Sequence, residues 1–232
     1  MDATKAKEML DKIVGQVFGY QNPFSLEQFM NKFAFDVRLP QQVYDATTNQ
    51  ATWAQSTNPT KFITMKNAWD KADAGGWELP KRPLASMQDI LTAWAETNLM
   101  ATEREIDSSN VAESDDTITS ENVYRSVFTT GSRNIIFSDG MADSEFVAAS
   151  QRSKLSSFSI RIDDSNKCSN SFNVSWSTGI TNSFFIQDCK DMQDSMFCSH
   201  LGGKRFYIAN MQFEEAEYIK LRDTVIRWIL TG

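Results

Sequence analysis

The sequence contains one histidine, His200, and three cysteines among its 232 residues. A lone histidine disfavours a catalytic triad with a histidine base and a histidine-rich metal site, so His200 is expected to be a turn residue. The cysteines, Cys168, Cys189 and Cys198, form no CxxC pair, which argues against a zinc site and a disulfide framework. We therefore expect no enzymatic activity, no cofactor, and no catalytic, cofactor-binding or metal-binding residues.

Positive charge and long apolar runs are also scarce. The 23 basic and 30 acidic residues give a net charge of -7, whereas proteins that bind phosphate backbones or anionic membranes present basic surfaces. No apolar run approaches the ~20 residues of a membrane-spanning helix, and the N-terminus lacks the apolar stretch of a signal peptide. The expected environment is a reducing cytoplasm, with neither nucleic acid nor a membrane as partner.

Residues 1–115 are expected to form a helical and loop-rich docking region. Residues 1–20 carry apolar side chains at helical spacing, which predicts an amphipathic helix. Ser25 and Gln28 match a capping box, with Phe24 and Phe29 as its hydrophobic staple, so a second helix should follow to about Phe33. The same device at residues 86–89 predicts a helix near residues 87–100.

The segments around these helices have less regular patterns. Prolines and a Gly-Gly pair interrupt residues 34–86, so packed loops or short strands are expected there. Trp53, Trp69, Trp77 and Trp94 are expected to contribute to the core. Residues 103–117 are acidic and polar, which is typical of a connector between two parts.

A short motif recurs in the C-terminal half. Asn-Ser, Asp-Ser or Ser-Ser dipeptides stand at five nearly evenly spaced sites, and a large apolar residue follows the serine at four of them. Apolar residues also recur three positions before and three positions after the serine, and such in-phase columns distinguish a structural repeat from a compositional bias. The intervals are close to a dozen positions, and those before Ser171 are slightly longer than those after it. The serines are Ser144, Ser157, Ser171, Ser183 and Ser195.

The two apolar columns of the repeat predict which side chains stack on one another. Three positions before the serine stand Met141, Cys168, Ile180 and Met192. Three positions after it stand Val147, Ile160, Val174, Ile186 and Cys198. Leu155 lies one position out of the first column, in a coil that the serine spacing makes longer.

A repeat of about 12 residues has room for one strand and a tight return, so it must bury its apolar side chains by stacking on its neighbours. We therefore predict an α+β protein in which residues 116–212 form a parallel β-solenoid. Five to seven coils would give a rod of roughly 25–35 Å. Asn and Asp would occupy the corners, because they tolerate left-handed backbone geometry. An antiparallel meander with turns at the same dipeptides is the alternative.

Residues 213–232 are expected to form a capping α-helix at the end of the solenoid. Tyr218, Leu221, Val225 and Ile229 lie on one face of this helix. The helix would protect the open edge that the last coil leaves, because such an edge invites the addition of foreign strands.

Closely spaced aspartates are the residues of the repeat that could carry chemistry. Asp188, Asp191 and Asp194 are spaced by three, and Asp163 and Asp164 are adjacent. They fit either a calcium site or a carboxylate pair of the kind that solenoid glycosidases use. Solvated turn residues are the simpler interpretation, because the repeat itself places Asp194 at a corner.

The end of the repeat resembles a known group of proteins. The run ITNSFFIQDCKDMQDSMFCSHLGGKRFYIANMQFEEAEYIKL is similar to the C-terminal half of uncharacterised proteins from phages and candidate-phylum bacteria. Those proteins have tandem Asn/Asp-Ser coils, a strand and an acidic helix, and the similarity covers roughly residues 120–222. Most members are richer in cysteine, so no metal or redox role carries over. The resemblance implies a solenoid in a phage or phage-derived setting.

Three functions are compatible with these patterns. The first is a non-catalytic structural or assembly protein of a phage virion (capsid decoration, minor capsid or tail-associated), assembled in the host cytoplasm and acting through other virion proteins or copies of itself as an oligomer. The second is a carbohydrate-binding or carbohydrate-cleaving β-solenoid, with tryptophans as sugar platforms and Asp188 and Asp191 as acid and base. The third is a regulatory adaptor that acts through the N-terminal amphipathic helix.

Overall fold

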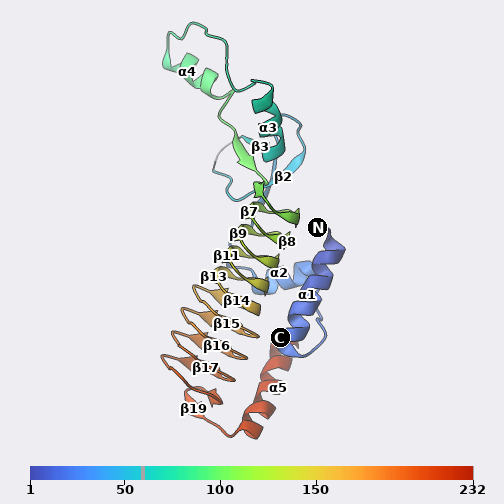
Figure 1. Cartoon of the computed structure of the whole chain (residues 1–232), viewed down its shortest axis with the longest axis vertical. Coiled ribbons are helices and arrows are strands. Elements are labelled where there is room, and N and C mark those ends of the chain that lie inside the picture. Colours follow the sequence, from blue (N-terminus) through green and yellow to red (C-terminus); the bar gives the residue numbers. More distant parts are fainter. Residues whose placement is uncertain (59–60, 232) are drawn as a thin grey trace.

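The structure is a computed structural model that describes residues 1–58 and 61–231. Figure 1 shows three parts: a small module at one end, a rod of stacked coils, and helices that lie along one flank of the rod. The small module comprises residues 41–102 and is called the head module below. The chain therefore has the α+β class that the sequence predicts.

The helices predicted near the N-terminus are confirmed. Helix α1 (Ala3–Phe18) begins after Asp2, whose side chain accepts a hydrogen bond from the Lys5 amide. Helix α2 (Leu26–Phe33) begins with the expected capping box of Ser25 and Gln28. Both N-terminal turns are stabilised because these side chains satisfy amides that have no partner within the helix.

The head module consists of short elements. Strands β1 (Gln41–Tyr44) and β2 (Ala51–Ala54) pair antiparallel, and β3 (Phe62–Thr64) pairs parallel with β4 (Met100–Thr102). Helix α3 (Met65–Asp73) follows β3. Helix α4 (Met87–Trp94) has the predicted cap at Ser86 but ends before residue 100. The expectation that the tryptophans join the core is wrong, because none of Trp53, Trp69, Trp77 and Trp94 is buried.

The rod is a parallel β-solenoid with the same coil length throughout. Register partners from Ser109 to Arg205 are always twelve positions apart, and these eight steps link nine coils. Nine coils correspond to a rod of about 40 Å, which is longer than the predicted five to seven coils. The parallel pairing rules out the antiparallel meander, apart from the terminal hairpin of β18 and β19.

The strands of the solenoid are short and mostly four residues long. They are β5 (Glu105–Ile106), β6 (Ser109–Ala112), β7 (Asp115–Ile118), β8 (Glu121–Tyr124), β9 (Val127–Thr130), β10 (Arg133–Ile136), β11 (Asp139–Ala142), β12 (Glu145–Ala148), β13 (Gln151–Lys154), β14 (Ser157–Asp163), β15 (Phe172–Ser175), β16 (Phe184–Gln187), β17 (Met196–Ser199), β18 (Tyr207–Ile208) and β19 (Met211–Gln212).

Two expectations about the coils need correction. Residues 103–117 are not a connector, since β5, β6 and most of β7 lie there and the ladder begins at Glu105 rather than at residue 116. Coils before β14 contain two strands rather than one, because β8, β10 and β12 stack on one side while β7, β9 and β11 stack on another. The sequence motif had marked only one of these sides.

Left-handed corners recur at a period of three. Every third residue from Asp107 to Ala209 has a positive φ, which gives each coil four corners. Asp143, Asn170, Asn182 and Asp194 occupy such positions, so the predicted corner role of Asn and Asp is confirmed. The side chains of corner residues point outward, and the residue that follows each corner points into the rod.

Serine side chains complete the hydrogen bonding inside the rod. Ser138 Oγ donates to the Ile136 carbonyl at 2.9 Å and accepts the Ser150 amide at 3.2 Å. Equivalent pairs of bonds recur at every sixth residue from Ser114 to Ser144. We call this arrangement the serine ladder. It gives a partner to amides such as that of Ser150. The carbonyls that accept from the hydroxyls also accept a backbone amide of the next coil, as the Ile136 carbonyl does from Ala149 at 3.0 Å.

The positions of the inward serines shift at β14 by one corner, that is, by three residues; we call this the change of phase. The first half of this seven-residue strand pairs with β12, whereas its second half pairs with β15. Inward serines stand at Ser144 and Ser156 before this point and at Ser171 and Ser183 after it. With the inward Ser156 in place of Ser157, the spacings of the motif become 12, 15, 12 and 12. The three extra positions before Ser171 are the change of phase by one corner, whereas the coils themselves are all of one length.

The change of phase also corrects the predicted columns. Val174, Ile186 and Cys198 do stack in register, but the residue before them is Ile162 rather than Ile160. Ile160 pairs with Phe172 and belongs to an outward column. Met141 and Cys168 are 27 positions apart, which is two coils of twelve residues and one corner of three. These two side chains therefore do not share a column.

The main hydrophobic core lies between the rod and its flanking helices. One outward column of the coils packs against α1, whose predicted apolar face is fully or almost fully buried. Helix α5 (Glu215–Thr231) confirms the predicted C-terminal helix. Its Tyr218 contacts Phe206 of the last coil, and the rest of the helix returns along the flank (Figure 1). Leu221 is exposed, contrary to prediction. The outward column consists of Tyr124, Ile136, Ala148, Ile160, Phe172, Phe184 and Met196.

Candidate functional site

The three aspartates spaced by three do not form a site. Asp188, Asp191 and Asp194 occupy successive corners, so their side chains leave the coil in different directions. Asp194 pairs with Arg205 at 2.9 Å, and Asp188 lies 4.0 Å from His200 one coil later. Among the residues that the structure describes, no group of three or more acidic, histidine or cysteine side chains could hold a metal ion.

The histidine and the cysteines occupy structural positions. His200 is a corner residue with a positive φ, and its side chain is 77% exposed. Cys189 takes the place of a ladder serine, because its Sγ accepts a hydrogen bond from the Leu201 amide at 3.4 Å. Burial raises the pKa of the Cys168 thiol to about 12, so this side chain is a protonated, unreactive core residue at neutral pH.

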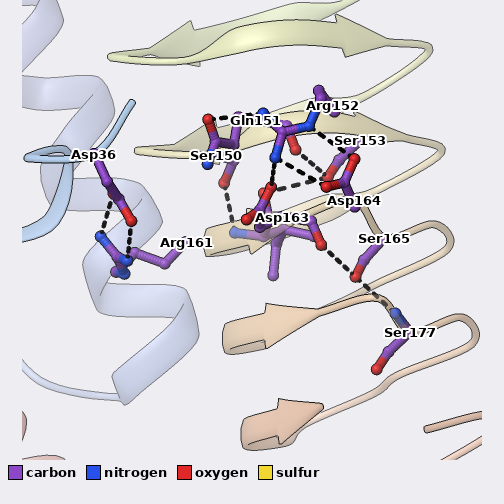
Figure 2. Close-up of polar contacts among 11 residues, drawn as sticks. Asp36, Ser150, Gln151, Arg152, Ser153, Arg161, Asp163, Asp164, Ser165 and Ser177 are labelled. Carbon is purple, nitrogen blue, oxygen red and sulfur yellow. Dashed lines mark hydrogen bonds and ion pairs between the residues drawn. The ribbon is translucent and has the colours of Figure 1, made fainter. Parts of the chain in front are cut away.

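The second acidic pair is held by one arginine at the change of phase (Figure 2). Arg152 lies at a corner and contacts both carboxylates of the next coil. Its Nη2 is 2.5 Å from Asp163, and its Nε and Nη2 are 2.8 and 2.9 Å from the two oxygens of Asp164. Strands β13 and β14 share one register pair, whereas β12 and β14 share three, so these ion pairs add contacts on the side of the coils that has fewer strand pairs.

A second ion pair attaches helix α2 to the same strand (Figure 2). Asp36, in the loop after α2, receives both terminal nitrogens of Arg161 at 3.0 and 2.9 Å. Arg161 also donates to the Phe33 carbonyl at the end of α2. Burial alone would raise the pKa of Asp36, but the hydrogen bonds from Arg161 outweigh it and lower that pKa. The helix is therefore fixed to β14 by a charged and bidentate contact.

The pKa values of the acidic pair move in opposite directions. Burial raises the pKa of Asp163, with Arg152 opposing that rise, whereas the hydrogen bond from Arg152 lowers the pKa of Asp164. Opposite shifts are a mark of acid and base pairs in glycosidases. Asp163 lines a cavity of about 110 Å³, which is small because ligand pockets usually measure ~300 Å³ or more. Asp164 lines a different cavity of about 420 Å³ together with Arg152. Because Arg152 engages both carboxylates, the cluster is best described as a tie between coils.

The apolar face of helix α1 is already buried against the rod of its own chain. Met9, Leu10, Ile13, Val14 and Val17 are at most 7% exposed and pack on the outward column of the rod. A regulatory adaptor that works through this face would first have to detach α1 from its own core. This contact argues against the adaptor hypothesis.

The most unusual surface lies in the head module. Residues 79–98, which we call the arm, carry helix α4 away from the rod (Figure 1). Large apolar side chains of the arm are 40–66% exposed: Leu79, Leu84, Met87, Ile90, Leu91 and Trp94. An eight-residue helix is too short to be stable alone in water, and clustered exposed apolar side chains mark interaction sites. We therefore regard the arm as the candidate functional surface.

The sequence contained only part of the signal for the arm. Four apolar side chains of α4 form one stripe along the helix, and such a stripe indicates a buried face. The pattern is the same whether that face packs on the core of its own chain or on another molecule, so the sequence predicts the helix but not what covers its apolar face. The prolines between α3 and α4 were the available hint that α4 leaves its neighbours. The stripe consists of Met87, Ile90, Leu91 and Trp94, and the prolines are Pro80 and Pro83.

Comparison with known proteins adds no assignment. The chain matches no protein-family model, and no curated protein or solved structure is significantly similar to it. Within the residues described, no helix has the length and apolar character needed to cross a bilayer.

Proposed function

We propose that this protein is a non-catalytic assembly component in which the rod is a rigid spacer and the arm joins copies of the chain to one another. The observation that carries this proposal is the exposure of the apolar side chains of α4 at the end of the molecule. Self-association would bury these side chains and would give the short helix the packing that it needs.

Charge favours a second copy as the occupant of the arm. The arm contains two basic residues, Lys81 and Arg82, and two acidic residues, Asp89 and Glu96, so it is neutral within a chain of net charge -7. Arg82 pairs with Glu96 at 2.6 Å, and Asp89 caps its own helix. A neutral apolar surface can face an identical surface without repulsion, and most oligomers are symmetric assemblies of identical chains.

Native mass spectrometry and light scattering over a concentration series test this proposal. The intact chain is expected to form a defined oligomer, and the double variant Leu91→Glu, Trp94→Glu is expected to be monomeric. Trp176→Glu is the matched control, because Trp176 is 57% exposed but lies on a corner of the rod. A monomeric parent chain, or an oligomer that the double variant leaves intact, would contradict the proposal.

The proposed setting is a phage virion, as a capsid-decorating, minor capsid or tail-associated component that also contacts other virion proteins. The resemblance of residues 120–222 to phage proteins supports this setting, and the rod geometry is compatible with it. Mass spectrometry of purified particles provides the check. Absence of the chain from particles would remove the virion setting and leave the self-association proposal to its own test.

A further inference from the structure

A cavity of about 290 Å³ lies where helix α2, the solenoid and helix α5 meet. Its walls come from three distant parts of the sequence. Aromatic side chains form most of the lining: Phe33 and Phe35 from α2 and the following loop, Phe172 and Phe185 from β15 and β16, and Trp228 from α5. We call this cavity the aromatic pocket.

The floor of the aromatic pocket is rigid and its rim is open. Phe33 and Phe172 are each 4% exposed, and their rings meet edge to face with centroids 5.6 Å apart. Phe35 and Trp228 at the rim are 72% and 59% exposed. Buried rings at the base and half-free rings at the mouth are the arrangement that accepts a flat apolar group between them.

The charged lining of the pocket has one sign. Lys32 and Arg161 line it, and no acidic residue does among the residues described, although the chain has more acidic than basic residues. The guanidinium of Arg161 is held in place by Asp36 and the Phe33 carbonyl. These contacts use three of the five N–H groups that a guanidinium carries. Asp36 balances the charge of Arg161, so Arg161 offers a ligand its two remaining N–H groups while Lys32 adds positive charge to the lining. Fixed donors and a positive charge beside an apolar surface favour a ligand with a negative group.

An amide at the same end of the pocket has donors and acceptors to offer. Asn173 is a corner residue, which directs its side chain outward, and it lines both the aromatic pocket and the small cavity beside Asp36. Its side chain forms no hydrogen bond within the described part of the chain. Pockets for small ligands combine an apolar lining with a few such placed polar groups that fix orientation.

We propose that the aromatic pocket binds a planar aromatic ring that carries a carboxylate. The ring lies between Phe35 and Trp228 over the buried phenylalanines, and the carboxylate faces Arg161 and Asn173. The volume is at the lower end of the ~300–1,000 Å³ of ligand pockets, so it suits one ring system rather than a dinucleotide or an oligosaccharide. A free aromatic acid and the C-terminal aromatic residue of a peptide share this chemistry.

Isothermal titration calorimetry on the full-length chain tests the pocket, with indole-3-acetate as the probe. We expect saturable binding, and we expect Phe35→Ala and Trp228→Leu each to weaken it about tenfold. The two variants lie on different elements and change exposed side chains, so a common loss of binding does not reflect unfolding. Trp176→Leu, which removes an equally exposed tryptophan from the rod, is expected to bind like the parent chain.

Two further probes test separately whether the negative charge of the ligand is needed and whether the ligand is a free aromatic acid or a peptide C-terminus. Indole-3-acetamide keeps the ring but lacks the charge, and we expect it to bind about tenfold more weakly. Glycyl-tryptophan compared with its C-terminal amide shows whether a peptide terminus is accepted, and discrimination between them assigns the peptide source. Absence of saturable indole-3-acetate binding, unchanged binding by both rim variants, or equal affinity for the acetamide would overturn the proposal. None of these outcomes depends on the oligomeric state.

Discussion

Removing one hydroxyl of the serine ladder should destabilise the rod by much more than a surface change would. Ser138 is fully buried, and its Oγ bonds both the Ile136 carbonyl and the Ser150 amide. Ser138→Ala leaves the Ser150 amide without a partner inside the rod, whereas the Ile136 carbonyl still accepts the Ala149 amide at 3.0 Å. One buried unsatisfied donor costs ~1–3 kcal/mol, so a loss of about 1–3 kcal/mol in the free energy of unfolding is expected.

The controls follow from the chain itself. Cys189 performs the ladder role with a thiol, so Ser138→Cys should recover part of the lost stability. Ser109→Ala removes a hydroxyl from an exposed position outside the ladder and should change stability by less than ~0.5 kcal/mol. Urea unfolding gives the free energies, and amide hydrogen exchange reports on Ser150 directly, whose amide should exchange faster in the alanine variant.

If Ser138→Ala and Ser109→Ala unfold at the same urea concentration, and if exchange of the Ser150 amide is unchanged, then the hydroxyl does not satisfy the backbone in the folded rod. The ladder would then be a consequence of small side chains fitting the corner rather than a source of stability.

Two further predictions concern pH. The Cys168 thiol keeps its proton to about pH 12 in the folded chain, against 9.0 ordinarily, so the unfolded state loses this proton first and stability should fall as pH rises above 9.0. Urea midpoints should show a smaller alkaline loss in Cys168→Ala. The pKa of Asp45 is lowered, since hydrogen bonds from Thr47, Thr64 and Asn67 outweigh burial, so its stabilisation should be present above pH 3.8 and be lost below it. Asp45→Asn should loosen the head module at neutral pH, and unchanged amide exchange there would contradict this.

The solenoid could be predicted from the sequence because its corners and its interior repeat. Asn and Asp at left-handed corners and serine after them recur with the coil, and that combination identified the class of fold. The period of six in the inward serines, from Ser114 to Ser156, was a stronger signal than the dipeptides and would have revealed two strands per coil. The dipeptides missed it because many corners carry Phe, Arg or Ala instead of Asn or Asp.

The change of phase at β14 could not be predicted from the repeat. Serine occupies positions 153, 156 and 159, so a shift by one corner leaves the local pattern unchanged. The register is decided by contacts with β12 on one side and β15 on the other. Likewise, the pairing of Arg161 with Asp36 spans 125 residues, and the aromatic pocket joins α2 to α5. Sequence spacing contains no information on such contacts.

The coil period also assigns contacts along the outside of the rod. Phe146 stacks on Phe158, and Phe185 stacks on Phe197, both with ring centroids 4.6 Å apart. Asn122 bonds Asn134 one coil later in the same way. Because adjacent strands are ~4.8 Å apart, any pair of flat side chains in this register is brought to stacking distance. The exterior of the rod is therefore a direct consequence of the sequence once the register is known.

This regularity bears on where function resides. A partner that bound only the repeated backbone and corners could shift along the rod by one coil and find nearly the same surface, so the rod alone gives weak positional specificity. The arm lies outside the repeat, and the aromatic pocket is formed by α2, α5 and one flank of the rod, so neither recurs along the coils that the structure describes. Variants of the arm should therefore alter assembly without altering the rod, and variants of corner residues far from both should alter neither assembly nor ligand binding.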